Sequence, residues 1–366
     1  MPNQFLLYGA NGYTGRLIAQ LAASYHLQPV LAGRNEKAIQ QLAEELQLAY
    51  RVIDLHDTAQ LQQCLTGIDL VLHAAGPFQL TGKAMMEACI ATRTHYIDIT
   101  GEITVFEMAK QFNEKAIEAG IMLMPGAGFD VVPTDCMALF LKNKLPDATM
   151  LQLAFASRGG GLSHGTAATM VLGLGEGGAI RHEGKIIQKP LGHRGMWVDF
   201  SPLEGETKKL FVMTIPWGDV STAFFTTGIP NIETYTSVPR KAYLLLKLQG
   251  AFNWLLKTSI VRNFANRKIS KLPPGPADEA RAKSSSLVWG RVQNSQGKTA
   301  TAYLQVKDGY TLTAHSSLLI AGKILAGNFK PGYQTPAAAY GEDLVLEIPD
   351  TKRTQTIYGE GSFIIR

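Results

Sequence analysis

The sequence predicts an α/β protein in which a doubly wound parallel sheet is followed by a second, α+β domain with a mainly antiparallel sheet. Two patterns indicate this fold class. Up to about residue 124, short apolar runs alternate with segments of helical period, as a parallel sheet requires. From about residue 150, apolar and polar residues alternate instead. Because 366 residues exceed one compact core, we expect domains at 1–135 and 136–330, with 331–366 returning to the first.

A glycine-rich turn joins the first predicted strand to the first predicted helix. The strand covers residues 5–8, and Gly9, Gly12 and Gly15 follow it in the pattern G-x-x-G-x-x-G. A helical period then runs to about residue 22, and a second strand covers 29–34, where it ends in a basic residue. In such a unit the glycines permit a tight turn, close approach of a pyrophosphate, and packing of the helix on the sheet. Free N–H groups at the helix N-terminus would face the phosphates, which predicts a Rossmann dinucleotide site.

The residue at the end of the second strand indicates which dinucleotide is bound. NAD sites usually carry an acidic residue there, whereas this chain has Arg34, with Asn35 and Lys37 beside it. A guanidinium binds a 2′-phosphate with two hydrogen bonds, so we expect NADP rather than NAD. The residues expected to bind the cofactor are Gly9, Asn11, Gly12, Tyr13, Thr14, Gly15, Arg34, Asp54, Ala75, Gly76, Pro77 and Phe78.

The remaining elements follow in order. In the first domain we expect further strands at 50–53, 69–74, 95–99 and 121–124, and helices at 36–46, 57–65, 82–91 and 103–118. Alternating stretches at 150–155, 210–215, 287–292 and 300–306 predict the second sheet. A strand and a helix are expected within 310–325, and a helix at 335–346.

Candidate catalytic residues follow three strands of the predicted parallel sheet. Ligands of such sheets bind at the carboxyl ends of the strands. Hydride transfer to or from a double bond needs a proton donor or acceptor, and Tyr96, Asp98, Glu102 and Asp130 stand at these strand ends. Each carboxylate could instead cap a helix or brace a loop. The remaining candidate, His164, is better interpreted as a loop histidine.

Composition bounds the function further. A net charge of +5 gives no indication of nucleic-acid binding, and three scattered cysteines suit a reducing cytoplasm. The histidines lack the spacing of metal ligands, so no metal site is expected. A strand within five residues of Met1 leaves no room for a signal peptide, and no apolar run reaches the length of a membrane span.

One segment stands apart by its charge. Residues 240–271 contain eight Lys or Arg and no Asp or Glu, interleaved with leucines and aromatic residues. A basic amphipathic helix can lie on an anionic membrane or contact an acidic carrier protein. It can equally pack on its own domain with its lysine stems along the surface, which is the simpler interpretation.

Taken together, the motifs resemble those of the saccharopine-dehydrogenase-like NAD(P)-binding oxidoreductases, in the short branch that includes trans-acting enoyl reductases. They are residues 9–16, 32–34, 75–78, 95–102, 128–135, 163–166 and 308–310. The resemblance covers nearly the whole chain. It implies a Rossmann domain, a catalytic domain and NADP-linked redox chemistry, but it does not imply saccharopine as the substrate.

The leading hypothesis is an NADP-dependent oxidoreductase that transfers hydride to or from a C=O, C=N or C=C bond of a small or acyl-type substrate. A non-enzymatic NADP-binding sensor and a membrane-peripheral protein are the alternatives. A homodimer is compatible with the sequence.

Overall fold

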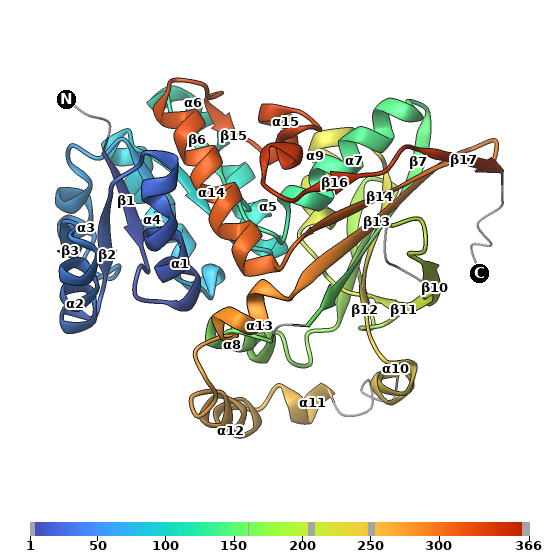
Figure 1. Cartoon of the computed structure of the whole chain (residues 1–366), viewed down its shortest axis with the longest axis horizontal. Coiled ribbons are helices and arrows are strands. Elements are labelled where there is room, and N and C mark those ends of the chain that lie inside the picture. The colour runs from blue at the N-terminus through green and yellow to red at the C-terminus, as the bar shows by residue number, and fades with distance from the viewer. Residues whose placement is uncertain (1–3, 160, 204–208, 248–252, 361–366) are drawn as a thin grey trace.

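The computed structural model describes residues 4–159, 161–203, 209–247 and 253–360. Its two sheets lie side by side, with the first sheet toward the N-terminal, blue part of the chain (Figure 1). No helix within these ranges combines the length and apolar character that crossing a membrane would need.

The first sheet has seven strands in the order β15-β6-β5-β4-β1-β2-β3, and every recorded pairing in it is parallel. The strand order reverses at β1, which confirms the doubly wound sheet. The strands are β1 (Phe5–Tyr8), β2 (Pro29–Gly33), β3 (Tyr50–Val52), β4 (Leu70–His73), β5 (His95–Asp98), β6 (Met122–Met124) and β15 (Gly332–Tyr333).

The helices between these strands also follow the predicted order, with two differences. They are α1 (Tyr13–Leu21), α2 (Glu36–Leu46), α3 (Thr58–Leu65), α4 (Phe78–Thr92), α5 (Ile103–Gln111) and α6 (Asn113–Ala119), with a 3₁₀ turn at Ala22–Tyr25. The helix expected at 103–118 is two helices, because Phe112 leaves the helical conformation at φ −90°, ψ 1°. Helix α4 begins four residues earlier than expected, because a distant carboxylate caps it, as described below.

The second sheet has ten strands and is mainly antiparallel, as predicted, with one parallel pair between β7 and β12. Its central path runs β10-β11-β12-β7-β13-β14-β16, while β8, β9 and β17 lie off this path. The strands are β7 (Ala148–Arg158), β8 (Gly178–His182), β9 (Lys185–Lys189), β10 (Gly195–Asp199), β11 (Lys209–Thr214), β12 (Asn231–Ser237), β13 (Ser285–Asn294), β14 (Lys298–Lys307), β16 (Lys352–Arg353) and β17 (Ile357–Glu360).

The second half contains further helices, which are α7 (Val132–Lys144), α8 (His164–Leu172), α9 (Asp219–Thr227), α10 (Arg240–Leu246), α11 (Asn253–Leu256), α12 (Ser259–Ile269) and α13 (Asp278–Ala282). Helices α10 to α12 fall in the basic segment for which a helix was considered, whereas the others were not expected. Helix α7 is buried around most of its circumference, so its sequence lacks the one-sided apolar stripe that identifies a surface helix. It packs closely on β13, where a Cβ on Gly290 would lie 2.6 Å from Met137.

The end of the chain contributes to both sheets. Residues 309–325, expected to be a strand and a helix, form one helix, α14 (Gly309–Leu325), because Asp308 accepts hydrogen bonds from the Tyr310 and Thr311 amides. Although we expected it in the second domain, α14 packs on α1 and β4 of the first. Strand β15 joins the first sheet beside β6, whereas β16 and β17 pair with β14 of the second. The helix expected at 335–346 is α15 (Pro336–Tyr340) plus a 3₁₀ turn at Leu344–Glu347.

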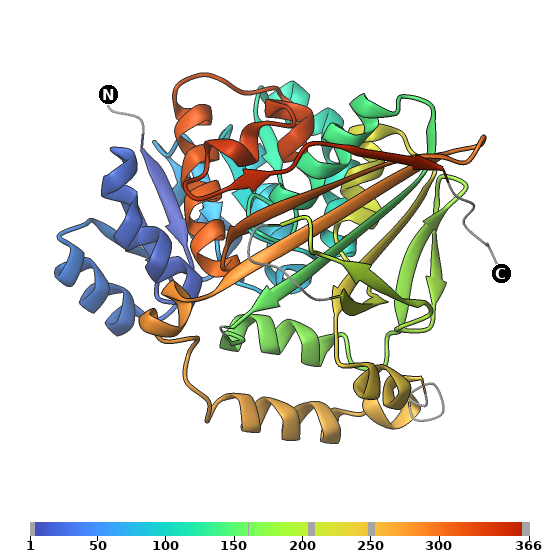
Figure 2. The same ribbon diagram turned by 45° about the vertical axis from the view of Figure 1, so that its right-hand side comes forward.

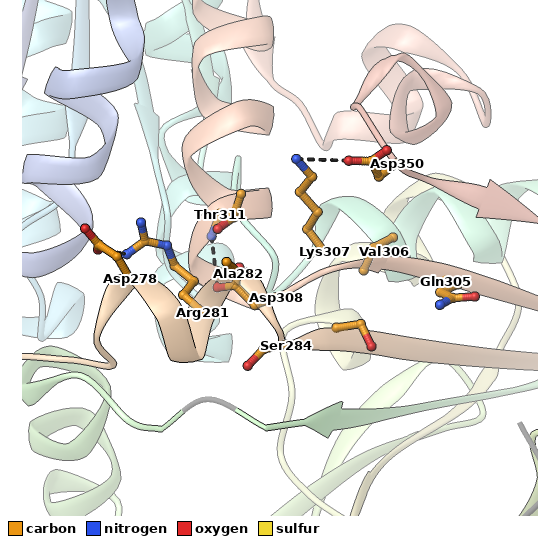
Figure 3. Close-up of a pocket in the computed structure, with 11 residues that line it drawn as sticks. Asp278, Arg281, Ala282, Ser284, Gln305, Val306, Lys307, Asp308, Thr311 and Asp350 are labelled. Carbon is orange, nitrogen blue, oxygen red and sulfur yellow. Dashed lines mark hydrogen bonds and ion pairs between the residues drawn. The ribbon is translucent and has the colours of Figure 1, made fainter. Parts of the chain in front are cut away.

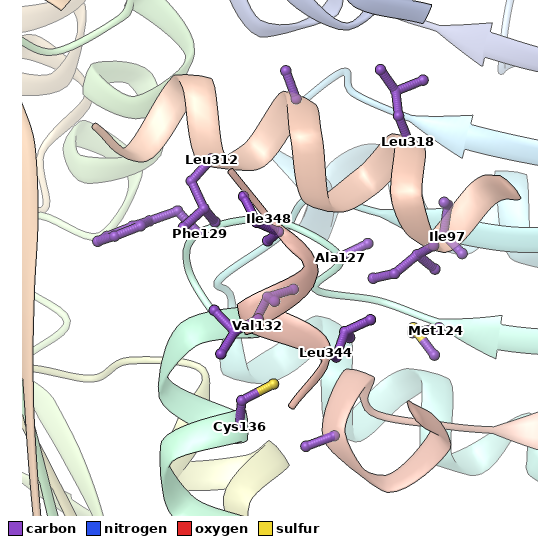
Figure 4. Packing of buried hydrophobic residues seen from close by; sticks show 14 of the residues in the cluster. Ile97, Met124, Ala127, Phe129, Val132, Cys136, Leu312, Leu318, Leu344 and Ile348 are labelled. Atoms are coloured by element: carbon purple, nitrogen blue, oxygen red, sulfur yellow. The ribbon is translucent and has the colours of Figure 1, made fainter. Parts of the chain in front are cut away.

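One continuous core joins the two halves. Figure 4 shows Leu312 and Leu318 of α14 above Phe129, which belongs to the connection between β6 and α7, and above Val132, the first residue of α7. Residues of both sheets belong to the same buried cluster, including Leu7 of β1 and Val288 of β13. The loop after β6 therefore lies within the shared core, and its position is fixed by elements far apart in the sequence.

Candidate active site

The glycine turn after β1 has the geometry that the sequence predicted. Gly9 has φ +83°, a conformation that favours glycine, and a Cβ there would lie 2.8 Å from Ala75. A Cβ on Gly15 would overlap the Gly9 carbonyl oxygen, so Gly15 lets α1 pack against the turn. Gly12 differs, because the only atom near its Cβ position is the Gly9 oxygen at 3.2 Å. The space beside Gly12 is therefore open.

The N-terminus of α1 fits the phosphates of a dinucleotide. Gly12 occupies the N-cap position, and no side chain in the described part of the chain hydrogen-bonds to the first amide groups of α1. By contrast, Asn35 and Asp57 cap α2 and α3 through their side chains. The uncapped amides and the positive end of the helix dipole can therefore receive an anion.

Arg34 stands at the end of β2, where the 2′-phosphate of NADP would be bound. Its side chain is exposed, and within the described residues its guanidinium has no hydrogen bond or ion pair. Asp54, at the end of β3, is also exposed, and its carboxylate accepts a hydrogen bond from the His56 amide at 3.0 Å. Burial raises the pKa of the Tyr8 hydroxyl to about 12. The charge of Arg34 lowers this pKa and the charge of Asp54 raises it, both by less than burial does.

Glu102 braces the turn that follows β4. Its two carboxylate oxygens accept hydrogen bonds from the amides of Phe78 and Gln79, both at 2.8 Å. These are the first amides of α4, so Glu102 caps that helix and ties the Gly76–Pro77 turn to the end of β5. Because both oxygens are engaged, we assign Glu102 a positioning role in place of the catalytic role that its sequence position suggested.

Asp98 and Tyr96 form a buried network beneath the strand ends. Asp98 accepts hydrogen bonds from the amides of Thr100 and Gly126, both at 2.9 Å, and from the Tyr96 hydroxyl at 2.7 Å. Burial raises the pKa of Asp98 to about 7 and lowers that of His73, 3.3 Å from the same hydroxyl, to about 3. Tyr96 and Asp98 are completely buried in this structure, and their hydrogen bonds join the ends of β5 and β6.

Asp130 differs from these carboxylates in two respects. It is partly exposed, and within the described residues its carboxylate has no hydrogen-bond or ion-pair partner. It lies against Gly101, where a Cβ would be 2.6 Å from Oδ2, and thus one residue from the Glu102 that braces the Gly76–Pro77 turn. Burial, with a smaller effect of the Glu102 charge, raises the pKa of Asp130 to about 7. A carboxyl group in this state can donate a proton near neutral pH.

Helix α14 holds the loop that carries Asp130. The Thr313 hydroxyl accepts a hydrogen bond from the Phe129 amide at 2.9 Å, and the Ser316 hydroxyl donates one to the Ala127 carbonyl at 2.7 Å. These two residues lie nearly 190 positions away in the sequence. Sequence reasoning did not find them, because small polar residues within a helix give no signal of a tertiary role.

An aromatic row begins beside Asp130. The ring of Phe129 lies 5.7 Å from that of Phe155, which in turn lies 4.6 Å from the ring of Trp217. The buried indole Nε1 of Trp217 has no hydrogen-bond partner in the described part of the chain. The nearby cations Lys110 and Arg181 both face Glu107, at 2.7 and 3.8 Å.

A strap of residues 272–281 crosses the glycine turn. At one end, His164 donates hydrogen bonds to the carbonyls of Leu272 and Pro274 through its ring and its amide. At the other, the Tyr13 hydroxyl donates to the Pro276 carbonyl at 2.7 Å and accepts from Arg281 at 3.0 Å. A Cβ on Gly275 would meet the Tyr13 ring at 2.5 Å. His164, expected to be a loop histidine, is the first residue of α8 and anchors the strap through these two hydrogen bonds.

A hollow of about 460 Å³ lies beside α13 and the start of α14, and Figure 3 shows the residues that line it. Its charged groups are already engaged. Lys307 pairs with Asp350 at 3.1 Å, Arg281 with Asp278 at 3.0 Å, and Asp308 caps α14. None of the residues predicted to bind cofactor or substrate lines it. The candidate active site therefore lies elsewhere, between the Gly76–Pro77 turn and Asp130.

Comparisons with known proteins agree with this geometry. Residues 5–124 match the family described as the saccharopine dehydrogenase NADP binding domain. A saccharopine dehydrogenase-like oxidoreductase of Rattus norvegicus is 27% identical over 205 residues, covering 49% of this chain and 48% of that protein. A trans-acting enoyl reductase of Mycobacterium ulcerans is 27% identical over 140 residues, covering 36% and 34%. The chain spans about half the length of the curated relatives it matches.

The likeness of fold extends further than the likeness of sequence. Apo saccharopine dehydrogenase (L-Glu forming) of Saccharomyces cerevisiae superposes with a TM-score of 0.63 and 13% identity, covering 96% of this chain and all of that one. At this identity the match shows the fold alone. The resemblance to saccharopine-dehydrogenase-like oxidoreductases is confirmed, and residues 5–124 are similar to an NADP binding domain.

Proposed function

We propose, from the premise of an NADP-binding first domain, that this protein is an NADP-dependent oxidoreductase in which Asp130 exchanges the proton that accompanies hydride transfer. The observation that carries the proposal is the state of Asp130. It is unpartnered within the described residues, partly exposed and of raised pKa, beside the turn where the nicotinamide is expected. The same proposal assigns the binding of the cofactor to residues 9–15, Arg34, Asp54 and residues 75–78.

The chemistry assigned to the chain's own residues is simple. Bound NADPH supplies a hydride to the carbon of a C=O, C=N or C=C bond. The Asp130 carboxyl group gives its proton to the other atom of that bond, becomes a carboxylate and is reprotonated from solvent through its exposed side. In the opposite direction the carboxylate accepts the proton. Tyr96, Asp98 and Glu102 keep the strand ends and the Gly76–Pro77 turn in place.

The surroundings of Asp130 favour a neutral, partly apolar substrate. Phe129, Phe155 and Trp217 supply aromatic surface, and the cations Lys110 and Arg181 are already paired with Glu107. A substrate rich in carboxylates would lack a counter-charge there. The Mycobacterium ulcerans relative is named an enoyl reductase, which supports including C=C bonds among the candidates.

NADPH oxidation across a panel of aldehydes, ketones, imines and 2-enoyl thioesters tests the activity, and NADPH fluorescence measures binding in parallel. Turnover of one of these substrates, lost on Asp130→Asn while binding persists, is the expected result. Stoichiometric binding without turnover of any of them would favour a non-enzymatic NADP sensor instead. Absence of binding would contradict both interpretations.

Arg34→Ala is expected to abolish most of the preference for NADPH over NADH. The unpaired guanidinium offers a charge-assisted bidentate bond to the 2′-phosphate, worth about 1.5 to 3 kcal/mol, or roughly ten- to a hundredfold in affinity. Dissociation constants of both cofactors, measured by fluorescence for the unmodified protein and the variant, check this. The matched control is Lys298→Ala, which removes an exposed cation on β14 of the second sheet, outside the residues proposed to hold the cofactor. Equal affinities in the unmodified protein would contradict the assignment.

We infer a cytoplasmic location, which the free thiols of Cys64, Cys89 and Cys136 support. A homodimer stays a prediction, and sedimentation of the purified chain would decide it.

A further inference from the structure

Three short helices form a row at one end of the molecule. Helices α10, α11 and α12 lie below both sheets in Figures 1 and 2, joined to the body through α8 and the strap. We call the described residues 240–247 and 253–271 the helical row; residues 248–252 of the predicted basic segment lie outside the described part of the chain. The single basic amphipathic helix considered from the sequence is therefore a series of shorter ones.

Large apolar side chains of the helical row face solvent. Ile260 is 79% exposed, Trp254 72%, Leu245 70% and Phe264 63%. Apolar side chains as exposed as these lose the free energy of burial that packing on the body would give. The simpler expectation, that the segment packs on its domain, accounts for only part of the row.

Helix α12 carries apolar residues on two separate stripes of its surface. Val261, Ala265 and Ile269 are half-buried on one stripe, and α12 packs against α8. Ile260 and Phe264 lie four residues apart on another, exposed stripe, and Lys268 continues it with its Nζ 5.4 Å from the Phe264 ring. The first stripe anchors the helix, so the second is free to contact something else.

The charges of the helical row have one sign. Lys257 and Arg262 pair with Glu176, at 3.4 and 2.9 Å, and thereby attach the row to the loop after α8. The other six cations have no carboxylate partner within the described residues; they are Arg240, Lys241, Lys247, Arg267, Lys268 and Lys271. From residue 234 to residue 277 the sequence contains no Asp or Glu.

We propose that the helical row docks on an anionic lipid surface, with the exposed Trp254, Ile260 and Phe264 entering the interface and the unpaired cations contacting headgroups. Amphipathic helices with aromatic and aliphatic residues on one side and Lys or Arg beside them bind membranes in this way. Each basic residue near such a surface adds to the attraction.

Lipid suits this surface better than an acidic protein does. The apolar side chains protrude separately from three short helices, whereas a protein interface needs a continuous, complementary patch. A lipid surface adapts to separate protrusions, and its uniform negative charge complements a segment without a single acidic residue. The strap then brings the docked row next to the cofactor turn, since Leu272 and Pro276 belong to the same ten-residue connection.

Flotation of the full chain with vesicles tests the proposal, without reference to redox activity. Vesicles of phosphatidylcholine with 30% phosphatidylserine are compared with pure phosphatidylcholine, at low salt and in 0.5 M NaCl. We expect binding to the anionic vesicles that weakens in high salt. Brominated lipids are expected to quench the fluorescence of the unmodified protein more than that of Trp254→Phe.

Two sets of variants separate the contributions. Arg267→Glu/Lys268→Glu/Lys271→Glu is expected to weaken binding to anionic vesicles by about a hundredfold or more, from roughly 1 kcal/mol per cation removed. Ile260→Ser/Phe264→Ser should also weaken it, by at least about tenfold. The control variant Lys298→Glu/Tyr358→Ser changes an exposed cation and an exposed aromatic residue on β14 and β17, at the other end of the molecule. It should bind as the unmodified protein does, and circular dichroism confirms that each variant is folded.

Failure to bind anionic vesicles at low salt would overturn the proposal. So would binding that the triple charge reversal leaves unchanged. If the row variants lose binding to a soluble acidic carrier protein while vesicle binding persists unaltered, the surface serves a protein partner and the lipid proposal is wrong.

Discussion

Asp130→Asn is expected to lower kcat by about a hundredfold to ten-thousandfold, the usual contribution of a positioned acid or base. Asn keeps the shape of the side chain beside Gly101 but has no proton to give at neutral pH. Because Asp130 has no partner among the described residues, the substitution breaks no bond there. The Kd of NADPH should therefore hardly change, and the Tm should not fall. Steady-state kinetics, cofactor titration and a thermal melt, all on the same preparation, measure the three quantities.

The pH dependence gives a second measure of the same residue. In the direction of reduction the carboxyl group must be protonated, and its pKa is about 7. We therefore expect kcat to fall as pH rises above about 7, and this dependence should be absent from Asp130→Asn. The free energy of unfolding should also fall as the pH rises. The reason is that the pKa of Asp130 in the folded state lies above the ordinary 3.8, so the folded state holds this proton more tightly than the unfolded state does. The stabilisation is complete below pH 4 and is lost as the pH rises through 7.

Asp98→Asn is the control for this variant. Its carboxylate has a pKa that burial also raises to about 7, but it accepts three hydrogen bonds in the interior. Replacing it should lower the Tm, because an amide cannot accept all three, while the fall of kcat near pH 7 should persist. A fall of kcat that disappears in Asp98→Asn and survives in Asp130→Asn would exchange the roles that we assign to these residues.

Local sequence predicted the first domain well, and the reason is physical. The period of the apolar residues and the glycine turn are signals within a few neighbouring residues, and a parallel sheet covered on both faces makes its strands uniformly apolar. Strand β4, whose four residues are all buried, is an example. The positions of Gly9 and Gly15 followed from the same local logic, since each has a backbone or packing constraint that only glycine meets.

What the sequence could not predict depends on distant partners. Glu102 was a candidate acid by its position, yet it caps a helix that begins 24 residues earlier. The support of the Asp130 loop by Thr313 and Ser316 crosses the chain from end to end. The prolines and the glycine at the start of the strap predict a bend, but they do not predict what the bend contacts. Helix α7 was missed because burial on most sides removes the amphipathic pattern.

The second prediction concerns Gly12, the glycine of the turn that is expected to face the cofactor. Gly12→Val is expected to abolish NADPH binding while the fold survives. Gly12 has φ −74° and ψ 165°, an extended conformation that valine adopts readily. Its Cβ would approach only the Gly9 oxygen, at 3.2 Å, so the two methyl groups would occupy the open space in front of the α1 amides, where the pyrophosphate is expected.

Two other glycines make this prediction discriminating. Gly15→Val should lower the Tm sharply as well as abolish binding, because its Cβ would overlap the Gly9 carbonyl within the protein itself. Gly322→Val, in α14, has nothing within 4 Å of its Cβ and should leave NADPH binding unchanged. Titration of NADPH fluorescence beside a thermal melt separates the three outcomes. If Gly12→Val binds NADPH as the unmodified protein does, the pyrophosphate does not lie over the glycine turn, and the position assigned to the nicotinamide beside Asp130 fails with it.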